Sequence, residues 1–226
     1  MTPAPSVLVF DVNETLIDIE SMAPFFERLF GDSSAMRIWF GQLVMYSMSA
    51  TLSGRYVDFF TLGQAVLRML ATTAGVHVTD DDALTLKHLL LTMPAHPDAK
   101  DSLEVLRDSG LRLVTLSNSP PNLDGPTPLE HAGLSHLFER QFSIDEVRSF
   151  KPAPAGYRYV SEQLGVDPAE CMMVAAHVWD TIGAQSAGFG GALITRPGNA
   201  ELPVAGLPRP TIVVTDLRAL AAQLGR

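Results

Sequence analysis

Four short segments carry the side chains of this sequence that could do chemistry, and each adjoins an apolar run or a helical pattern. A carboxylate that stays ionised can attack an electrophilic centre and form a covalent intermediate, and a nearby ammonium group favours the ionised form. Each segment alone is ordinary, because an Asp after a strand is commonly a turn residue. Together, in this order, they predict one catalytic site; they are residues 11–16 (DVNETL), 117–119 (SNS), 151–152 (KP) and 175–180 (AAHVWD).

The elements that must position these segments are short, nearly continuous apolar runs, which are typical of strands buried on both faces of a parallel sheet. The runs are residues 7–10, 111–116, 171–175, 192–194 and 212–214. Helical patterns between them cover residues 98–109, 154–164 and 180–187, and each is followed by a glycine, a common helix stop. The order predicts an α/β fold with a doubly wound, Rossmann-like parallel sheet.

The connection between the first two strands is far longer than the dozen or so residues that a crossover requires. Residues 21–91 are rich in helix formers and contain no clear strand, so we expect about four helices there. We therefore predict a helical cap domain at 18–91 and an α/β core domain at 1–17 and 92–226. Such a cap would lie over the carboxyl ends of the strands, where α/β sheets place their sites.

The composition limits the classes of partner. The chain has 226 residues, is 46% hydrophobic and carries a formal net charge of -9, so nucleic acid and anionic membranes are poor partners for it. Its single cysteine, Cys171, excludes an intramolecular disulfide. No apolar run reaches the roughly 18 residues of a membrane helix, and no secretory signal is visible, so we expect a cytoplasmic protein.

The four segments and the inserted helices resemble the haloacid dehalogenase (HAD) superfamily, and more narrowly its type II L-2-haloacid dehalogenase branch. The resemblance covers nearly the whole chain and implies a HAD-like core with a cap. In that branch an Asp is followed four residues later by Thr, a Ser-Asn pair comes next, a Lys precedes a Tyr by six residues, and a Trp-Asp pair ends the series. The matching residues are Asp11, Thr15, Ser117, Asn118, Lys151, Tyr157, Trp179 and Asp180.

Two positions separate this chain from the phosphatases of the same superfamily. A phosphatase needs a second Asp two residues after its nucleophile to protonate an alkoxide leaving group, and Asn13 cannot do this. It also needs Mg²⁺, held in part by a Gly-Asp pair where this chain has Ala175 and Ala176. Both losses favour attack on a carbon that bears a halide, with no metal and no cofactor.

The resemblance implies a two-step hydrolysis in which Asp11 displaces halide from C2 of a 2-haloacid and water then cleaves the ester. Lys151 would keep Asp11 ionised, Thr15 and Ser117 would orient it, and Asp180 would place Lys151 and the water. The remaining expected residues would hold the substrate or form the pocket wall. They are Asn118 with the backbone of Val12 and Asn13, and the side chains of Tyr157, Trp179, Met45 and Phe60.

The chain departs from the branch at two places. Phe40 stands where the branch has an Arg that is thought to receive the halide, and His177 stands where it has an Asn. His177 could be a base for the water or a partner of the substrate carboxylate; it could equally be a buried neutral imidazole. Arg37, Arg55 and Arg196 could supply the missing cation, or could be solvated surface charges.

Two further readings stay open beside a dehalogenase with a small-molecule 2-haloacid substrate. One is a HAD-fold phosphatase of a small phosphorylated metabolite, and the other is a catalytically degenerate interaction protein. Resemblance alone also implies a homodimer. The natural substrate, the preferred halide and the stereochemistry do not follow from the sequence.

Overall fold

A six-stranded sheet forms the centre of the computed structural model, which describes residues 4–225 of the chain. The strand order is β3-β2-β1-β4-β5-β6, and every neighbouring pair is parallel. β1 and β4, at the middle of the sheet, are buried along their whole length, as their apolar runs predict. The strands are β1 (Val7–Phe10), β2 (Arg112–Ser117), β3 (Arg140–Ser143), β4 (Cys171–Ala175), β5 (Gly190–Ile194) and β6 (Ile212–Val214).

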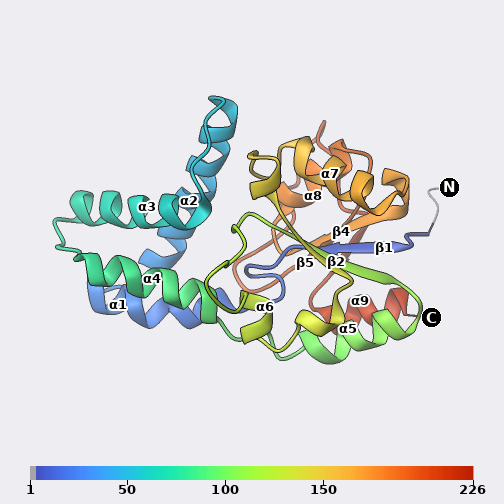
Figure 1. Cartoon of the computed structure of the whole chain (residues 1–226), viewed down its shortest axis with the longest axis horizontal. Helices are drawn as coiled ribbons and strands as arrows, with labels where there is room; N and C mark the ends of the chain where they lie inside the picture. The colour runs from blue at the N-terminus through green and yellow to red at the C-terminus, as the bar shows by residue number, and fades with distance from the viewer. Residues whose placement is uncertain (1–3, 226) are drawn as a thin grey trace.

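Helices cover both faces of the sheet, which confirms the predicted doubly wound α/β fold (Figure 1). α5 (Ala99–Asp108) and α9 (Leu217–Leu224) contact each other on one face, and α7 (Pro154–Leu164) and α8 (Val178–Ser186) contact each other on the other face. Short elements fill the connections: α6 (Pro128–His131) and the 3-10 helices η2 (Ser135–Leu137), η3 (Ile144–Glu146) and η4 (Pro168–Glu170).

Between β1 and β2 the chain forms a separate helical group on the side of the sheet where β1 ends (Figure 1). Asp58 caps one of its helices by accepting from the backbone N–H groups of Phe60 and Thr61, and the Trp39 indole donates to the Gly63 carbonyl at 2.9 Å, which ties two helices together. The group comprises η1 (Ile19–Met22), α1 (Ala23–Phe30), α2 (Ala35–Leu52), α3 (Phe59–Ala74) and α4 (Asp80–Thr92). The division into a cap at 18–91 and a core stays a prediction.

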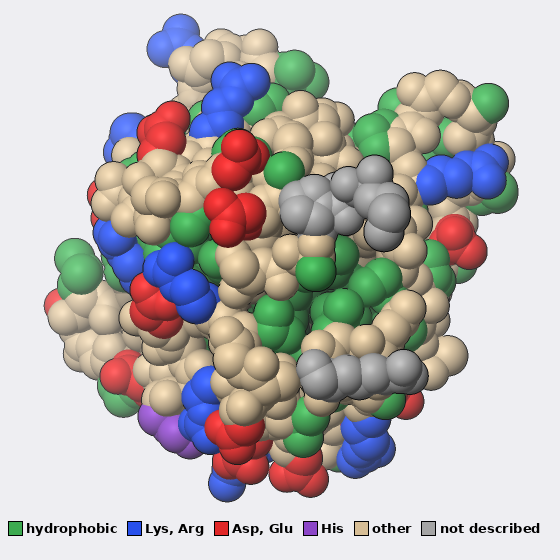
Figure 2. Space-filling view, turned by 90° about the vertical axis from the view of Figure 1, so that its right-hand side faces the viewer, with side chains coloured by type: hydrophobic (Ala, Val, Ile, Leu, Met, Phe, Trp, Pro, Cys, Tyr) green, Lys and Arg blue, Asp and Glu red, His purple; other side chains and the backbone are tan. Residues whose placement is uncertain are grey.

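One strand and several boundaries differ from the sequence-based prediction. β3 was not predicted because its sequence, RQFS, has a single large apolar residue, Phe142, and lies at the exposed edge of the sheet. α8 begins at Val178, two residues before its predicted start, because His177 is already the N-cap residue. No described helix is long and apolar enough to cross a membrane. Figure 2 shows acidic and basic side chains interspersed over one face.

Candidate active site

Asp11 follows β1 directly and lies among the carboxyl ends of β1, β2 and β4, where the four predicted segments meet. Its backbone N–H donates to the Val174 carbonyl of β4 at 3.0 Å, which continues the sheet pairing by one residue. Lys151 Nζ donates to Asp11 Oδ1 at 2.8 Å, to Asp180 Oδ2 at 2.7 Å and to the Leu116 carbonyl at 2.8 Å. Lys151 is fully buried, and these bonds occupy all three of its N–H donors.

The second oxygen of Asp11 is held by Thr15. Thr15 Oγ1 donates to Asp11 Oδ2 at 2.9 Å and accepts from the Ala176 backbone N–H at 2.8 Å. Burial raises the pKa of Asp11, but the charge of Lys151 and the interactions with His177 outweigh it and lower this pKa to about 2. Asp11 is therefore an ionised and oriented carboxylate at neutral pH.

Tyr157 lies behind the Lys151 ammonium group, not at the pocket wall where it was expected. Its hydroxyl donates to Asp180 Oδ1 at 2.6 Å, and its side chain is fully buried. Burial raises the pKa of Asp180, and the attraction of Lys151 opposes that rise. The close approach of α8 depends on Gly183, because a Cβ there would lie 2.5 Å from Pro152 and 2.7 Å from the Tyr157 hydroxyl. Tyr157 thus fixes the carboxylate that positions Lys151.

A small cavity adjoins Asp11. Its volume is about 10 Å³, room for about one water-sized sphere, so a larger molecule can enter only if side chains around it move. Asn118 Oδ1 accepts from the Lys151 backbone N–H at 3.0 Å, which leaves the Asn118 amide N–H₂ free to donate. The lining residues are Asp11, Asn13, Phe40, Val44, Phe59, Asn118, His177 and Trp179.

Two apolar wall residues differ by one position from those expected. Met45 is 49% exposed, and its neighbour Val44 lines the cavity instead. Phe60 faces the loop at 120–124, and its neighbour Phe59 lines the cavity instead. One residue turns a helix by about 100°, so a prediction that is one position off selects a different face.

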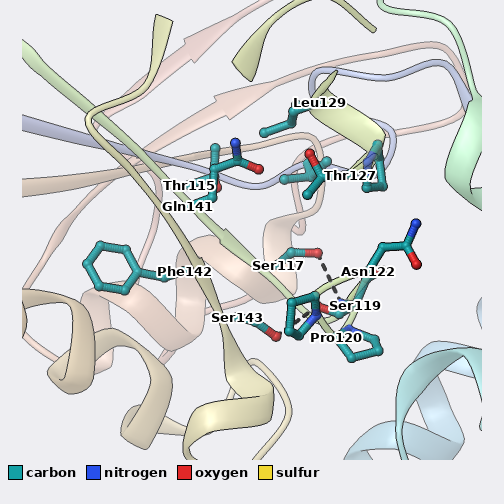
Figure 3. Close-up of a pocket in the computed structure, with 13 residues that line it drawn as sticks. Thr115, Ser117, Ser119, Pro120, Asn122, Thr127, Leu129, Gln141, Phe142 and Ser143 are labelled. Carbon is teal, nitrogen blue, oxygen red and sulfur yellow. Dashed lines mark hydrogen bonds between the residues drawn. The ribbon is translucent and has the colours of Figure 1, made fainter. Parts of the chain in front are cut away.

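Ser117 makes no hydrogen bond to Asp11, contrary to its expected orienting role. Its Oγ accepts from the Ser119 backbone N–H at 3.0 Å, and its side chain lines a second cavity of about 290 Å³ beyond the ends of β2 and β3 (Figure 3). Val12 also lines this second cavity. Asn13 lies between the two cavities, because it lines the first and its Nδ2 donates to Ser119 Oγ at 3.4 Å.

Glu14 was not singled out in the sequence, yet it is a buried partner of His177. His177 Nε2 bonds to Glu14 Oε2 at 2.7 Å, and its ring lies between those of Phe40 and Trp179, with centroid distances of 5.6 and 5.2 Å. Glu14 has a φ of 68°, an uncommon conformation for a residue with a side chain. The sequence offered one sign of its role, an acidic residue inside the first segment. Acidic residues are also common in turns, and a turn was already expected there.

The three arginines considered as substitute cations do not line the cavity beside Asp11. Arg37 forms ion pairs with Glu14 and Glu20. Arg196 binds Asp98 at 2.9 Å and the Thr15 carbonyl at 2.9 Å, and Arg55 is exposed. Over residues 4–225, no three His, Cys, Asp or Glu side chains are grouped so that they could hold a metal ion. Metal-free chemistry itself stays a prediction.

Comparisons with known proteins agree on one family. The sequence profile of the haloacid dehalogenase-like hydrolases matches residues 5–188. The chain is 31% identical to an (S)-2-haloacid dehalogenase of Xanthobacter autotrophicus, over 93% of this chain and 84% of that protein. It is 30% identical to an (S)-2-haloacid dehalogenase of Pseudomonas sp. (strain YL), over 94% and 91%.

Solved structures give the same result. The L-2-haloacid dehalogenase of Xanthobacter autotrophicus with chloropropionic acid covalently bound superposes with a TM-score of 0.86 at 28% identity, covering 96% of this chain and 97% of that one. Another L-2-haloacid dehalogenase superposes with a TM-score of 0.91 at 30% identity, covering 99% and 100%.

Proposed function

The chain belongs to the haloacid dehalogenase-like hydrolases, and we propose that it hydrolyses the carbon–halogen bond of short 2-haloalkanoic acids to give 2-hydroxy acids. The observation that carries the proposal is the pairing of a buried, ionised Asp11 with Lys151 at 2.8 Å, beside Asn13. Asn13 cannot protonate a leaving group, and a halide leaves without a proton. The (S)-2-haloacid dehalogenases that resemble this chain support the same reaction.

In the first step Asp11 attacks C2 of the haloacid. A carboxylate oxygen forms a bond to C2 while the electron pair of the carbon–halogen bond leaves with the halide, which inverts C2. Lys151 and Thr15 hold the carboxylate, so the attacking oxygen needs no reorientation. Val44, Phe59 and Trp179 would surround the carbon chain, and the free amide of Asn118 would donate to the bound anion.

In the second step water attacks the carbonyl carbon of the Asp11 ester. The bond between that carbon and the ester oxygen breaks, and the 2-hydroxy acid leaves with an oxygen that began in Asp11. One proton of the water ends on the hydroxyl group and the other goes to solvent. Asp11 regains its carboxylate with one oxygen from the water, and Lys151 and Asp180 balance the charge that changes at Asp11.

The proposal is tested first by a halide-release screen. Purified protein is expected to release halide from haloacetates and from the (S) enantiomer of 2-chloropropionate, because the relatives act on (S)-2-haloacids. Fluoro-, chloro- and bromoacetate and both chloropropionate enantiomers are the substrates, and p-nitrophenyl phosphate with Mg²⁺ is the rival. Phosphate release without halide release would establish the phosphatase, and no release from any of them would favour the degenerate interaction protein.

Chelation provides a second, independent prediction. Halide release is expected to survive exhaustive EDTA treatment, because Asn13 and Ala176 replace the acid and part of the metal site that a phosphatase requires. The rate is measured before chelation, after it, and after Mg²⁺ is added back. Activity that is lost on chelation and restored by Mg²⁺ would contradict metal-free chemistry.

The assembly and the place of action are finer proposals. By resemblance we propose a homodimer that acts in the cytoplasm, with the helical cap at 18–91 closing over the core. Sedimentation of the purified chain measures its mass, and a monomeric mass would remove the dimer from the proposal.

A further inference from the structure

The cavity beside Asp11 must accept a negative charge, and Lys151 is not free to bind it. A 2-haloacid brings a carboxylate and releases a halide, so negative charge must be accepted close to the Asp11 carboxylate. The three donors of Lys151 are already bound to Asp11, Asp180 and a backbone carbonyl. Among the described residues, no Lys or Arg side chain lines this cavity, and Phe40 holds the position where the family resemblance expects an Arg.

His177 supplies a buried ring nitrogen there that has no hydrogen-bond partner among the described residues. Its side chain is 10% exposed, and Nδ1 is buried without a hydrogen bond to any described residue. Nδ1 lies 3.9 Å from Asp11 Oδ2, too far for a hydrogen bond but close enough for both atoms to contact one bound anion or reacting molecule. His177 lines the cavity, and its ring is held between Phe40 and Trp179.

The opposite edge of the ring faces a fixed negative charge. Glu14 is 1% exposed, and besides the bond to His177 it forms an ion pair with Arg37 and accepts from Asn199 Nδ2 at 2.8 Å. Burial lowers the pKa of His177, but the interactions with Asp11 and Glu14 outweigh it and raise this pKa to about 9. An imidazole in this state carries a proton on both nitrogens, so Nδ1–H is a charged donor.

We propose that His177 is an imidazolium at neutral pH whose Nδ1–H binds the negative charge of the haloacid, on its carboxylate or its departing halide, and that Glu14 is the positioning residue that keeps it charged. The identity of the anion rests on the proposed function. A cation at this place compensates for Phe40. It also means that His177 does not act as the base for water in the free enzyme, because it has no lone pair to accept a proton.

Charge counting supports the same assignment. With His177 neutral, the three buried carboxylates of Asp11, Glu14 and Asp180 outnumber the two cations Lys151 and Arg37, and the haloacid would add a further negative charge. The second carboxylate partner of Arg37, Glu20, is half-exposed and is screened by solvent. A protonated His177 balances the three buried carboxylates before the substrate arrives. Such a charge-assisted hydrogen bond typically contributes about 10- to 100-fold in affinity.

Anion binding is expected to weaken as pH rises, and His177 is the group that causes this change, although other charged groups face it. The pKa values of Asp11 and Glu14 lie below their ordinary values, and those of Lys151 and Arg37 lie above theirs. The Asp180 carboxyl, whose pKa burial raises, contacts Lys151 and not His177. Between neutral pH and about pH 10, His177 is therefore the group expected to lose its charge.

The protonation state is tested directly by NMR of protein labelled with ¹⁵N-histidine, with the His177 signal assigned from its loss in His177→Asn. The wild-type imidazole is expected to be doubly protonated at pH 7.5 and to titrate near pH 9. In Glu14→Gln its pKa is expected to fall toward the ordinary value of about 6.5. A neutral wild-type His177 at pH 7.5, or a pKa that Glu14→Gln leaves unchanged, would overturn the proposal.

Anion binding is measured separately with bromide and acetate, which have no carbon–halogen bond to hydrolyse, so Asp11 stays in place and continues to favour the charged form of His177. Affinities for bromide and for acetate are followed by the Trp179 indole N–H signal, and His177→Asn is expected to weaken at least one of them about 10- to 100-fold. Loss of bromide affinity alone assigns the halide, and loss of acetate affinity alone assigns the carboxylate. The matched control is His88→Asn, on the exposed surface of α4, which should change neither affinity.

Three outcomes separate this proposal from its rivals. If both affinities stay within about twofold in His177→Asn, the proposal is wrong. If His177→Asn binds both anions normally but accumulates the Asp11 ester during turnover, His177 is a base and the proposal is also wrong. If the wild type releases no halide but its anion affinity still depends on His177, the dehalogenase function fails and the anion site stands.

Discussion

Asp11→Asn is expected to lower the rate of halide release on the order of 10⁶-fold, the cost typical of losing a catalytic nucleophile. The replacement keeps the shape of the side chain, and it removes the anionic oxygen that Lys151 and Thr15 hold at 2.8 and 2.9 Å. An amide oxygen attacks carbon far more weakly than a carboxylate does. The measurement is halide release from 2-chloropropionate under conditions that saturate the wild type.

The oxygen source separates covalent catalysis from direct attack by water. In a single turnover in ¹⁸O-water with enzyme in excess, the first 2-hydroxy acid should carry unlabelled oxygen, because that oxygen comes from Asp11. One atom of label should appear in Asp11 itself. Product labelled to the enrichment of the solvent would mean that water attacks C2 directly, and the ester mechanism would be wrong.

The loss of rate must be distinguished from a loss of fold. Asp101→Asn is a matched control, because Asp101 is an exposed carboxylate on α5, far along the chain from β1. It should release halide at the wild-type rate. If thermal unfolding shows that Asp11→Asn remains folded, the loss of rate belongs to the chemistry.

The sheet was predictable from the sequence where burial determines composition. β1 and β4 are buried on both faces, so nearly every residue in them is apolar, and a run of apolar residues marks them. β3 lies at the edge of the sheet, where solvent covers one side and polar residues are tolerated. Its pairing with β2 is made by backbone groups, which every residue carries, so the sequence RQFS contains no comparable signal.

The sequence predicted which segments meet at the site, but it did not predict which atoms contact one another there. Parallel strands bring their carboxyl ends to one edge, so Asp11 and Asp180, which follow β1 and β4, had to lie near each other once these strands were recognised. Lys151 follows β3, which was not predicted, so its place at the site came only from the family resemblance. Which atoms bond there depends on distances of about an ångström, which residue spacing does not determine. Ser117 bonds to its own loop for this reason, and Tyr157 bonds to Asp180 behind Lys151.

The pairing of Glu14 with His177 was missed in the sequence, because Glu14 gave no distinctive sign of its role. It lies between Asp11 and Thr15 in a segment that was already expected to be a turn, where acidic residues are common. Its importance arises from its left-handed backbone conformation and from His177, which is 163 positions away in the chain. A pairing over that separation becomes visible only when the ends of β1 and β4 are placed side by side.

Lys151→Met is expected to reduce both activity and stability. The ammonium group is fully buried between Asp11 and Asp180, and removing one partner of such a group leaves carboxylates unpaired in the interior, which typically costs about 3–5 kcal/mol. The rate of halide release is expected to fall about 10²- to 10³-fold, the typical cost of removing one electrostatic donor from a catalytic site, because Asp11 loses the ammonium group that orients it.

The pH dependence of the free energy of unfolding identifies the cause of the destabilisation in Lys151→Met. Without Lys151, burial should raise the folded-state pKa values of Asp11 and Asp180 above their unfolded-state values, so the folded variant binds more protons than the unfolded chain. Its free energy of unfolding should therefore fall as pH rises, and the deficit relative to wild type should be larger at about pH 8 than at about pH 5. The measurement is denaturant unfolding at both pH values.

Lys100→Met, at an exposed position of α5, is the matched control and should show no deficit at either pH. A deficit for Lys151→Met that is equal at both pH values would mean that lost packing, and not unpaired carboxylates, destabilises the variant.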